Sequence, residues 1–132
     1  MVFADASALV AILAEEPDGA ALTDRLEAEG KRLCSALSVW ETVAALCHRY
    51  SLSVASARED VGRYLEAGDF QFVAIGEQEF EIAADAYAQF GKGRHPAALN
   101  MGDCFSYACA KANRAALLFK GDDFSRTDIE AA

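Results

Sequence analysis

Short apolar segments alternate with longer amphipathic segments along this chain, and that alternation restricts the fold more than any other feature. Strands that alternate with helices predict a parallel sheet covered on both faces. We therefore expect an α/β fold, a three-layer α/β/α sandwich with a central parallel sheet, formed by residues 1–132 as a single domain. The predicted strands are residues 2–5, 32–37, 70–75 and 115–119, and the predicted helices are 7–16, 17–30, 38–50, 53–67, 77–90 and 102–113.

Composition excludes several classes of protein. No apolar stretch reaches the roughly 18 residues of a membrane helix, and the N-terminus lacks the basic region of a secretory signal, so we expect a cytoplasmic protein without a membrane anchor. The four cysteines form no C-x-x-C pair and only two histidines are present, so no zinc spacing occurs. The net charge of −9 argues against a general nucleic-acid binder. A cluster of acids can nevertheless hold cations, which the formal charge leaves out.

The first apolar segment, MVFADASALV, is interrupted by a carboxylate at Asp5. A charge buried in a core costs several kcal/mol unless it is paired or bound to metal. Capping of the next helix is one explanation, although Ser7 would cap it at a smaller desolvation cost. A bound cation is the other explanation.

Further acids follow or flank the predicted strands. In an open parallel sheet, sites form outside the carboxyl ends of the strands, so these acids reach one crevice if the strands are neighbours. Oxygen ligands without Cys or His suit a hard cation such as Mg²⁺ or Mn²⁺. Such an ion activates water and stabilises attack at a phosphodiester. The candidate catalytic residues are Asp5, Glu41, Asp103, Asp122 and Asp123.

Each acid also has a structural explanation. The sequence SVWE predicts a capping box, with Ser38 at the N-cap and Glu41 at the third helical position. Asp103 could cap the helix that it begins. The GDD sequence at 121–123 is also typical of an ordinary turn. The metal-site hypothesis therefore depends on the set of acids and not on any one of them.

Three segments, in their order, resemble the PIN domains, in particular the VapC-type toxins of bacterial toxin–antitoxin pairs. They are VFADASALVAIL, SALSVWETVAAL and LNMGDCFSYACAKANRAALLFKGDDFSRTDI, and the similarity covers nearly the whole chain. The resemblance implies a small endoribonuclease that depends on Mg²⁺, for which Mn²⁺ can substitute. It also implies an RNA substrate, a cognate antitoxin protein that neutralises the enzyme, and a homodimer.

Carried over by position, the resemblance makes Asp5 and Asp103 the principal metal ligands and Glu41 the third acid. Many relatives place an acid or Asn directly after the last strand, and a second Asp just before a Phe. In this chain a glycine occupies the first of those places. Asp123 is therefore the first candidate for the fourth acid, and Asp122 the second.

Further contacts are expected around these acids. Ser7 matches a family position that usually holds a small hydroxyl or Asn, which implies that it orients a carboxylate or a metal-bound water. Lys92 and Arg94 lie in the sequence GKGRH, whose glycines allow close approach to an RNA phosphate. A solvated loop is an equally good explanation of this segment. Lys120 and Arg126 flank the acidic turn, either as phosphate contacts or as surface charges.

Two other functions compete with the nuclease. A receiver-type phosphotransfer domain also clusters acids around Mg²⁺, but it needs an accepting Asp after a middle strand, where this chain has Gly76. The second is a non-catalytic PIN-like module that binds RNA or protein, which would have lost several of the acids. Because Asp5, Glu41 and Asp103 are all present, the sequence favours the nuclease.

Overall fold

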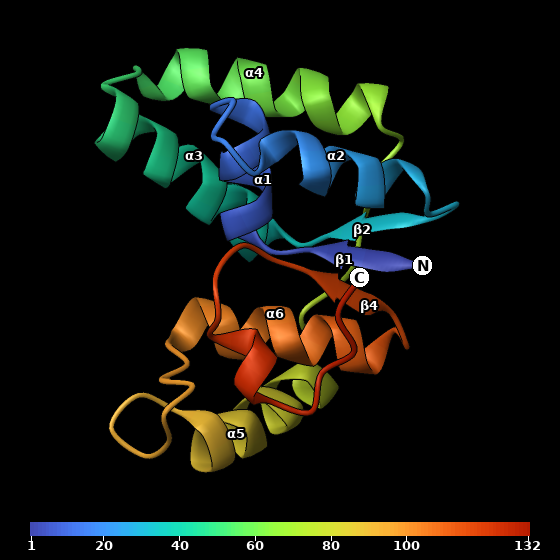
Figure 1. The fold of residues 1–132 in the computed structure, drawn as a ribbon, viewed down its shortest axis with the longest axis vertical. Coiled ribbons are helices and arrows are strands. Elements are labelled where there is room, and N and C mark those ends of the chain that lie inside the picture. The colour runs from blue at the N-terminus through green and yellow to red at the C-terminus, as the bar shows by residue number, and fades with distance from the viewer.

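A computed structural model, which describes all of residues 1–132, shows helices on both sides of a four-stranded parallel sheet (Figure 1). The strand order is β3-β2-β1-β4, so β1 and β2 are the central strands. In chain order the elements are β1 (Val2–Ala4), α1 (Ala6–Leu13), α2 (Gly19–Glu27), β2 (Arg32–Cys34), α3 (Ala36–Tyr50), α4 (Val54–Ala67), β3 (Gln71–Phe72), α5 (Glu77–Phe90), α6 (Met101–Ala112), β4 (Ala116–Leu118) and a short 3₁₀ helix η1 (Phe124–Arg126).

The alternation of side chains along the strands divides the core between the two faces of the sheet. Phe3, Leu33 and Leu117 belong to a buried cluster with residues of α5 and α6. Their neighbours Val2 and Leu118 point the other way, into a cluster with α1 and α2. A third cluster joins β2 to α1, α3 and α4. The predicted three-layer sandwich is therefore confirmed, with α1 to α4 in one outer layer and α5 and α6 in the other (Figure 1).

The predicted elements match the observed ones in type, and the differences lie at their ends. The strand predicted at residues 70–75 is only Gln71–Phe72 and lies at the sheet edge, where Phe72 is 58% exposed. Its β-forming residues predicted a longer strand, but an edge strand has a partner on one side only. The second strand also ends early, because α3 already begins at Ala36.

The parallel topology gathers several chain segments at one edge of the sheet. The carboxyl ends of β1 and β2 lead directly into α1 and α3, and β4 leads into the turn before η1. A hydrogen bond from the Asp5 amide to the Leu118 carbonyl (2.9 Å) joins the ends of β1 and β4. Because α6 precedes β4 and runs antiparallel to it, the first turn of α6 lies at this same edge (Figure 1).

Two further observations bear on the exclusions made from composition. The helices of the structure are all too short or too polar to cross a bilayer. The cysteines form no disulfide, and three of the four are buried: Cys34, Cys104 and Cys109.

Candidate metal-binding and active site

Asp5 directly follows β1 and caps α1, and every polar contact of its carboxylate comes from a serine. One oxygen, Oδ2, accepts hydrogen bonds from the Ser7 amide (2.9 Å) and the Ser7 hydroxyl (2.6 Å). The other, Oδ1, accepts one from the Ser106 hydroxyl (2.6 Å), and Asp5 is only 5% exposed. The proposal that Ser7 would cap this helix in place of Asp5 is wrong, because the backbone of Asp5 itself occupies the N-cap position. Capping thus accounts for part of the Asp5 position.

Ser7 connects this carboxylate to the last strand. Its hydroxyl donates to Asp5 and also accepts a hydrogen bond from the Lys120 amide (3.0 Å). One side chain therefore holds the end of β1, the start of α1 and the end of β4 in a fixed relation.

Glu41 has no capping role, and the predicted Ser38–Glu41 box is wrong. The capping box of α3 lies one turn earlier, where Ser35 and Ser38 exchange side-chain to backbone hydrogen bonds of 3.0 Å. Residues 35–37 were predicted to continue the second strand, so the earlier start of the helix was not expected. Burial, with the charges of Asp5 and Asp103, raises the pKa of Glu41 to about 7.

Asp103 combines a capping contact with a position among the acids. It is the third residue of α6, and its Oδ2 accepts a hydrogen bond from the Asn100 amide (3.1 Å), while its own amide donates to Asn100 Oδ1 (2.9 Å). Burial, followed by the charges of Asp5 and Asp123, raises the pKa of Asp103 to about 6, despite the opposing bond from Asn100. Asn100, and not Asp103, is the N-cap.

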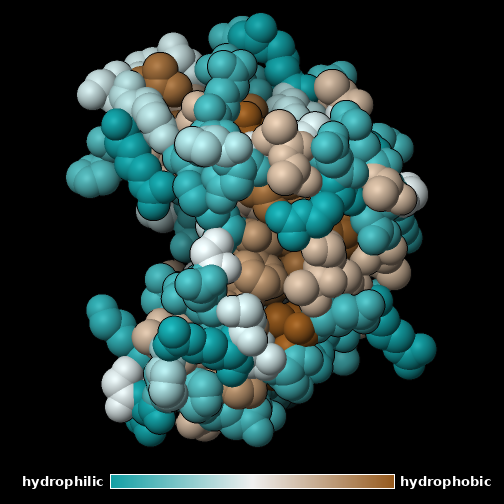
Figure 2. Space-filling view, in the orientation of Figure 1, coloured by the Kyte–Doolittle hydropathy of each residue, from teal (hydrophilic) through white to brown (hydrophobic).

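The three carboxyl groups line one small pocket of about 180 Å³. They come from three distant segments, and the surface outline is indented where α3 and α6 face each other (Figure 2). No three Asp, Glu, His or Cys side chains form a ready-made set of metal ligands. The complete lining is Asp5, Ala6, Ser7, Val10, Glu41, Ala45, Arg49 and Asp103.

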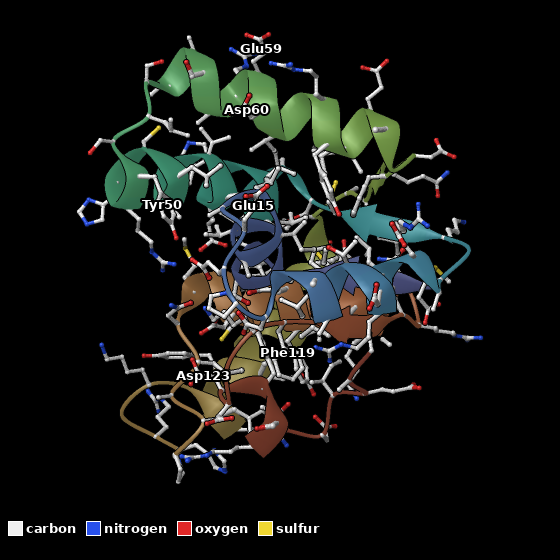
Figure 3. The ribbon with its side chains drawn as sticks, turned by 45° about the horizontal axis from the view of Figure 1, so that its top comes forward. Glu15, Tyr50, Glu59, Asp60, Phe119 and Asp123 are labelled. Carbon is white, nitrogen blue, oxygen red and sulfur yellow. The ribbon has the colours of Figure 1, made fainter.

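The two acids of the GDD turn differ in their relation to this pocket. Both are exposed and neither lines it, but the charge of Asp123 contributes to the raised pKa of Asp103. Figure 3 shows Asp123 on the turn that follows β4. Asp122 has no such influence, and its carbonyl accepts a hydrogen bond from Ser125 (2.6 Å). Of the two acids, Asp123 therefore has the stronger electrostatic effect on Asp103.

The basic residues expected to contact substrate lie outside the pocket. Lys92 lines a separate, mostly apolar hollow between α5 and the start of α6. Arg94 lies over the Tyr87 ring, with its guanidinium carbon 5.1 Å from the ring centre. Lys120 pairs with Glu16 (2.7 Å) and Arg126 donates to the Pro96 carbonyl (3.2 Å).

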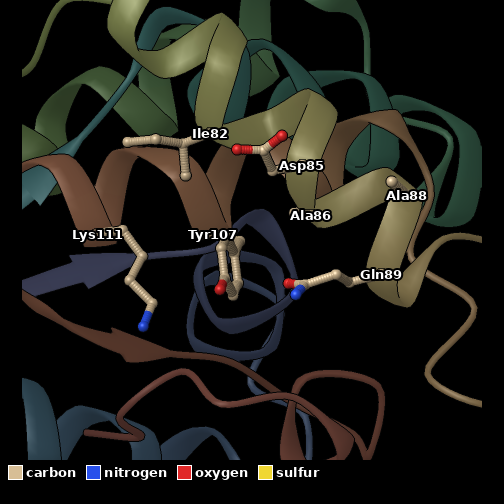
Figure 4. Close-up of a pocket in the computed structure, with 7 residues that line it drawn as sticks. All are labelled: Ile82, Asp85, Ala86, Ala88, Gln89, Tyr107 and Lys111. Carbon is tan, nitrogen blue, oxygen red and sulfur yellow. The ribbon is translucent and has the colours of Figure 1, made fainter.

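A larger hollow between α5 and α6, of about 520 Å³, shares no residue with the acidic pocket (Figure 4). Two of its polar side chains are already engaged, since the Tyr107 hydroxyl and the Lys111 ammonium both donate to Asp128 (2.6 and 3.1 Å). Asp85 is its only acid. The smaller pocket is therefore the one that gathers several carboxyl groups.

Two residues of α6 support the site and were missed in the sequence. Ser106 lies one turn beyond Asp103, and this spacing, which puts both on one helix face, is the signal that could have revealed it. Gly102 leaves room for Glu41, because a methyl group there would lie only 2.6 Å from the Glu41 carboxyl carbon. Nothing in the sequence reveals that second contact.

Comparison with known proteins gives a consistent assignment. The family model described as "PIN domain" matches residues 2–130. The chain belongs to the PIN-domain family. It is 41% identical to the VapC ribonuclease Mb0640 of Mycobacterium bovis over 95% of this chain and 93% of that protein. It is 42% identical to the VapC ribonuclease R02377 of Rhizobium meliloti, over 98% and 99% of the two chains.

A solved structure shows the same fold at low sequence identity. The crystal structure of Mycobacterium tuberculosis VapC20, described as a toxin that cleaves the sarcin–ricin loop, superposes with a TM-score of 0.77. The match covers 100% of this chain and 98% of that one, at 17% identity. The three-layer architecture of this chain is therefore that of a VapC structure.

Substitution of Gly102 tests the contact with Glu41. In Gly102→Ala the new methyl group displaces the Glu41 carboxyl from its partly buried place, and its pKa falls from about 7 toward the usual value of about 4.3. Carboxyl ¹³C NMR titration measures this change. Gly62→Ala is the matched control, because Gly62 lies in α4 with open space around it. That change should stabilise the fold by about 0.5–1 kcal/mol and leave Glu41 unaffected. An unchanged Glu41 pKa in Gly102→Ala contradicts the packing.

The raised pKa of Glu41 also predicts a pH dependence of stability in metal-free protein. Between about pH 4.3 and about pH 7, the folded state retains the proton that the unfolded state releases, so the free energy of unfolding falls as pH rises. Glu41→Gln removes this term. The free energy of unfolding of Glu41→Gln, relative to that of the parent, should therefore rise with pH across this range. Urea unfolding in the presence of a chelator measures this difference. The exposed Glu81→Gln serves as control, and a pH-independent difference for Glu41→Gln contradicts the prediction.

Proposed function

We propose that this protein is an endoribonuclease that depends on a divalent metal ion, Mg²⁺ or Mn²⁺, and hydrolyses RNA phosphodiester bonds. One observation carries the proposal: in a PIN-domain chain, three carboxyl groups from distant segments line one pocket at the carboxyl edge of a parallel sheet. The naming of its relatives as VapC ribonucleases supports the same activity.

The donors of the pocket fit a hard cation. Its acidic side chains offer only oxygen ligands, and neither Cys nor His lines it. Mg²⁺ typically uses one or two protein carboxylates and retains several waters, which agrees with a pocket that holds no complete ligand set. Asp5 and Asp103 would hold the ion. When bound, such an ion activates water and stabilises the charge that develops at phosphorus.

The protein's own residues keep these acids in place. The hydroxyls of Ser7 and Ser106 fix the orientation of the Asp5 carboxylate. The Asn100 amide holds one oxygen of Asp103 and leaves the other without a protein partner. Glu41 makes no hydrogen bond to the protein, so its carboxylate is available to orient a water. Asp123 adds negative charge beside Asp103.

The same family membership motivates proposals about partners. We expect a cognate antitoxin to neutralise the enzyme, and the net charge of −9 suits a basic segment of such a partner. Large exposed apolar side chains, among them Trp40 (67%) and Met101 (65%), are suited to burial against another protein. We also expect a homodimer, from the resemblance, and a cytoplasmic location, from the sequence.

The substitution Asp103→Asn tests the proposal with little disturbance of the fold. The amide oxygen of Asn can still accept the Asn100 hydrogen bond, so α6 keeps its capping box while the pocket loses a ligand charge. Cleavage of a labelled total-RNA pool in Mg²⁺ or Mn²⁺ should fall by more than the roughly 100-fold that outer-sphere changes cause. Asp5→Asn should behave in the same way, with an added loss of stability of about 1 kcal/mol from the buried serine contacts.

The control is Asp85→Asn, an exposed substitution on α5 that should cleave as the parent does. Full activity of Asp103→Asn would contradict the site. Well-folded parent protein that cleaves no RNA in either metal would contradict the nuclease and favour the non-catalytic binding module.

A further inference from the structure

One basic side chain lies at the mouth of the acidic pocket. Arg49, in the last turn of α3, is the only basic residue among those that line it. Glu41, Ala45 and Arg49 are spaced four residues apart, so they lie on one face of the helix, and all three line the pocket. The small side chain of Ala45 leaves the space between the acid and the base open. This face of α3 thus carries an acid in the pocket and an exposed cation at its rim.

Arg49 has no partner within the protein. It makes no ion pair, and its side chain makes no hydrogen bond, whereas the nearby Glu16 is already occupied. Glu16 accepts hydrogen bonds from the Lys120 ammonium (2.7 Å) and the Tyr50 hydroxyl (2.6 Å). Those two bonds hold the pKa of Glu16 below its usual value, and the charge of Arg49 adds a smaller effect. The guanidinium at the rim is therefore available to a ligand.

The other basic residues of the region are less suited to hold an anion. Lys120 is already shared between Glu16 (2.7 Å) and Asp18 (3.4 Å). Arg94 is stacked on Tyr87, and Lys92 lines a different hollow. Arg49 alone combines a place at the acidic pocket with an unused charge.

The position of Arg49 also excludes a role as resident counter-ion of the acids. Arg49 lies eight positions after Glu41 on α3, about 12 Å along the helix axis. The pKa values of Glu41 and Asp103 are raised by burial and by other acids, with no cation acting against them. The guanidinium charge therefore acts at the rim of the pocket and leaves the interior free for a cation.

We propose that Arg49 binds a phosphate of the RNA strand adjacent to the phosphate that enters the acidic pocket, an inference that rests on the proposed nuclease function. A guanidinium is suited to this contact, because its donors match two phosphate oxygens at once. A phosphate on Arg49 and a cation among the acids would together fix the register of the strand. Arg49 is then a substrate-binding residue, and it holds the substrate in the ground state and the transition state alike.

The test compares Arg49→Ala and Arg49→Lys with the parent in two assays. The first is RNA cleavage. The second is binding of a labelled single-stranded RNA, measured by fluorescence anisotropy over a salt series. Arg49→Ala should raise KM and the RNA Kd about tenfold, with kcat nearly unchanged, because uniform binding is lost. Loss of one phosphate contact should also reduce the slope of log Kd against log salt by about 0.7. Arg49→Lys should restore the slope, and only part of the affinity.

The control Arg58→Ala removes an exposed arginine from α4, outside the acidic pocket, and should change neither KM nor the salt slope. Binding of Mn²⁺, followed by calorimetry, should be at least as strong in Arg49→Ala as in the parent. If Arg49→Ala keeps the parent KM and slope and only lowers thermal stability, Arg49 merely complements the end of α3 and the proposal is overturned. This conclusion about Arg49 holds only if the parent protein cleaves RNA. An inactive parent would instead overturn the proposed nuclease function.

Discussion

The buried carboxylate of Asp5 and the two serine hydroxyls that hold it are the contact on which the rest of the site depends. A carboxylate that is 5% exposed is stable there only because both of its oxygens accept hydrogen bonds. The donors come from α1 and α6, and Ser7 also accepts the Lys120 amide at the end of β4. The sheet register, the start of α1 and the placement of α6 are thereby joined at one point. The remaining acids are then brought toward a carboxylate whose position is fixed.

Much of the fold follows from local patterns in the sequence. Alternating apolar and amphipathic segments predicted the layers, and α5 matches its predicted range of 77–90. The errors occurred where tertiary contacts or competing local signals decide the boundary. The strand at 70–75 has strong β-forming residues, but only two of them pair at the edge. The capping signal at Ser38 was real, but Ser38 is the reciprocal partner of an earlier cap at Ser35.

The site was predictable in part, for a clear physical reason. Parallel strands place the residues that follow them at one edge, so Asp5, Glu41 and Asp103 could be grouped from their order along the chain. Contacts made between elements could not be found in this way. The space that Gly102 leaves for Glu41 depends on how closely α6 approaches α3. The sequence also directed attention to Lys92 in a glycine-rich loop, while Arg49, in an unremarkable helical segment, lines the pocket.

The central claim is that these crowded acids share a divalent cation, and the most direct test locates the cation itself. Crystals of the parent protein soaked in Mn²⁺ should show an anomalous peak within coordination distance of carboxylate oxygens of both Asp5 and Asp103. The same soak of Asp103→Asn crystals should show the peak lost or much weakened. A peak at another site, or none in the acidic pocket at saturating Mn²⁺, would contradict the account.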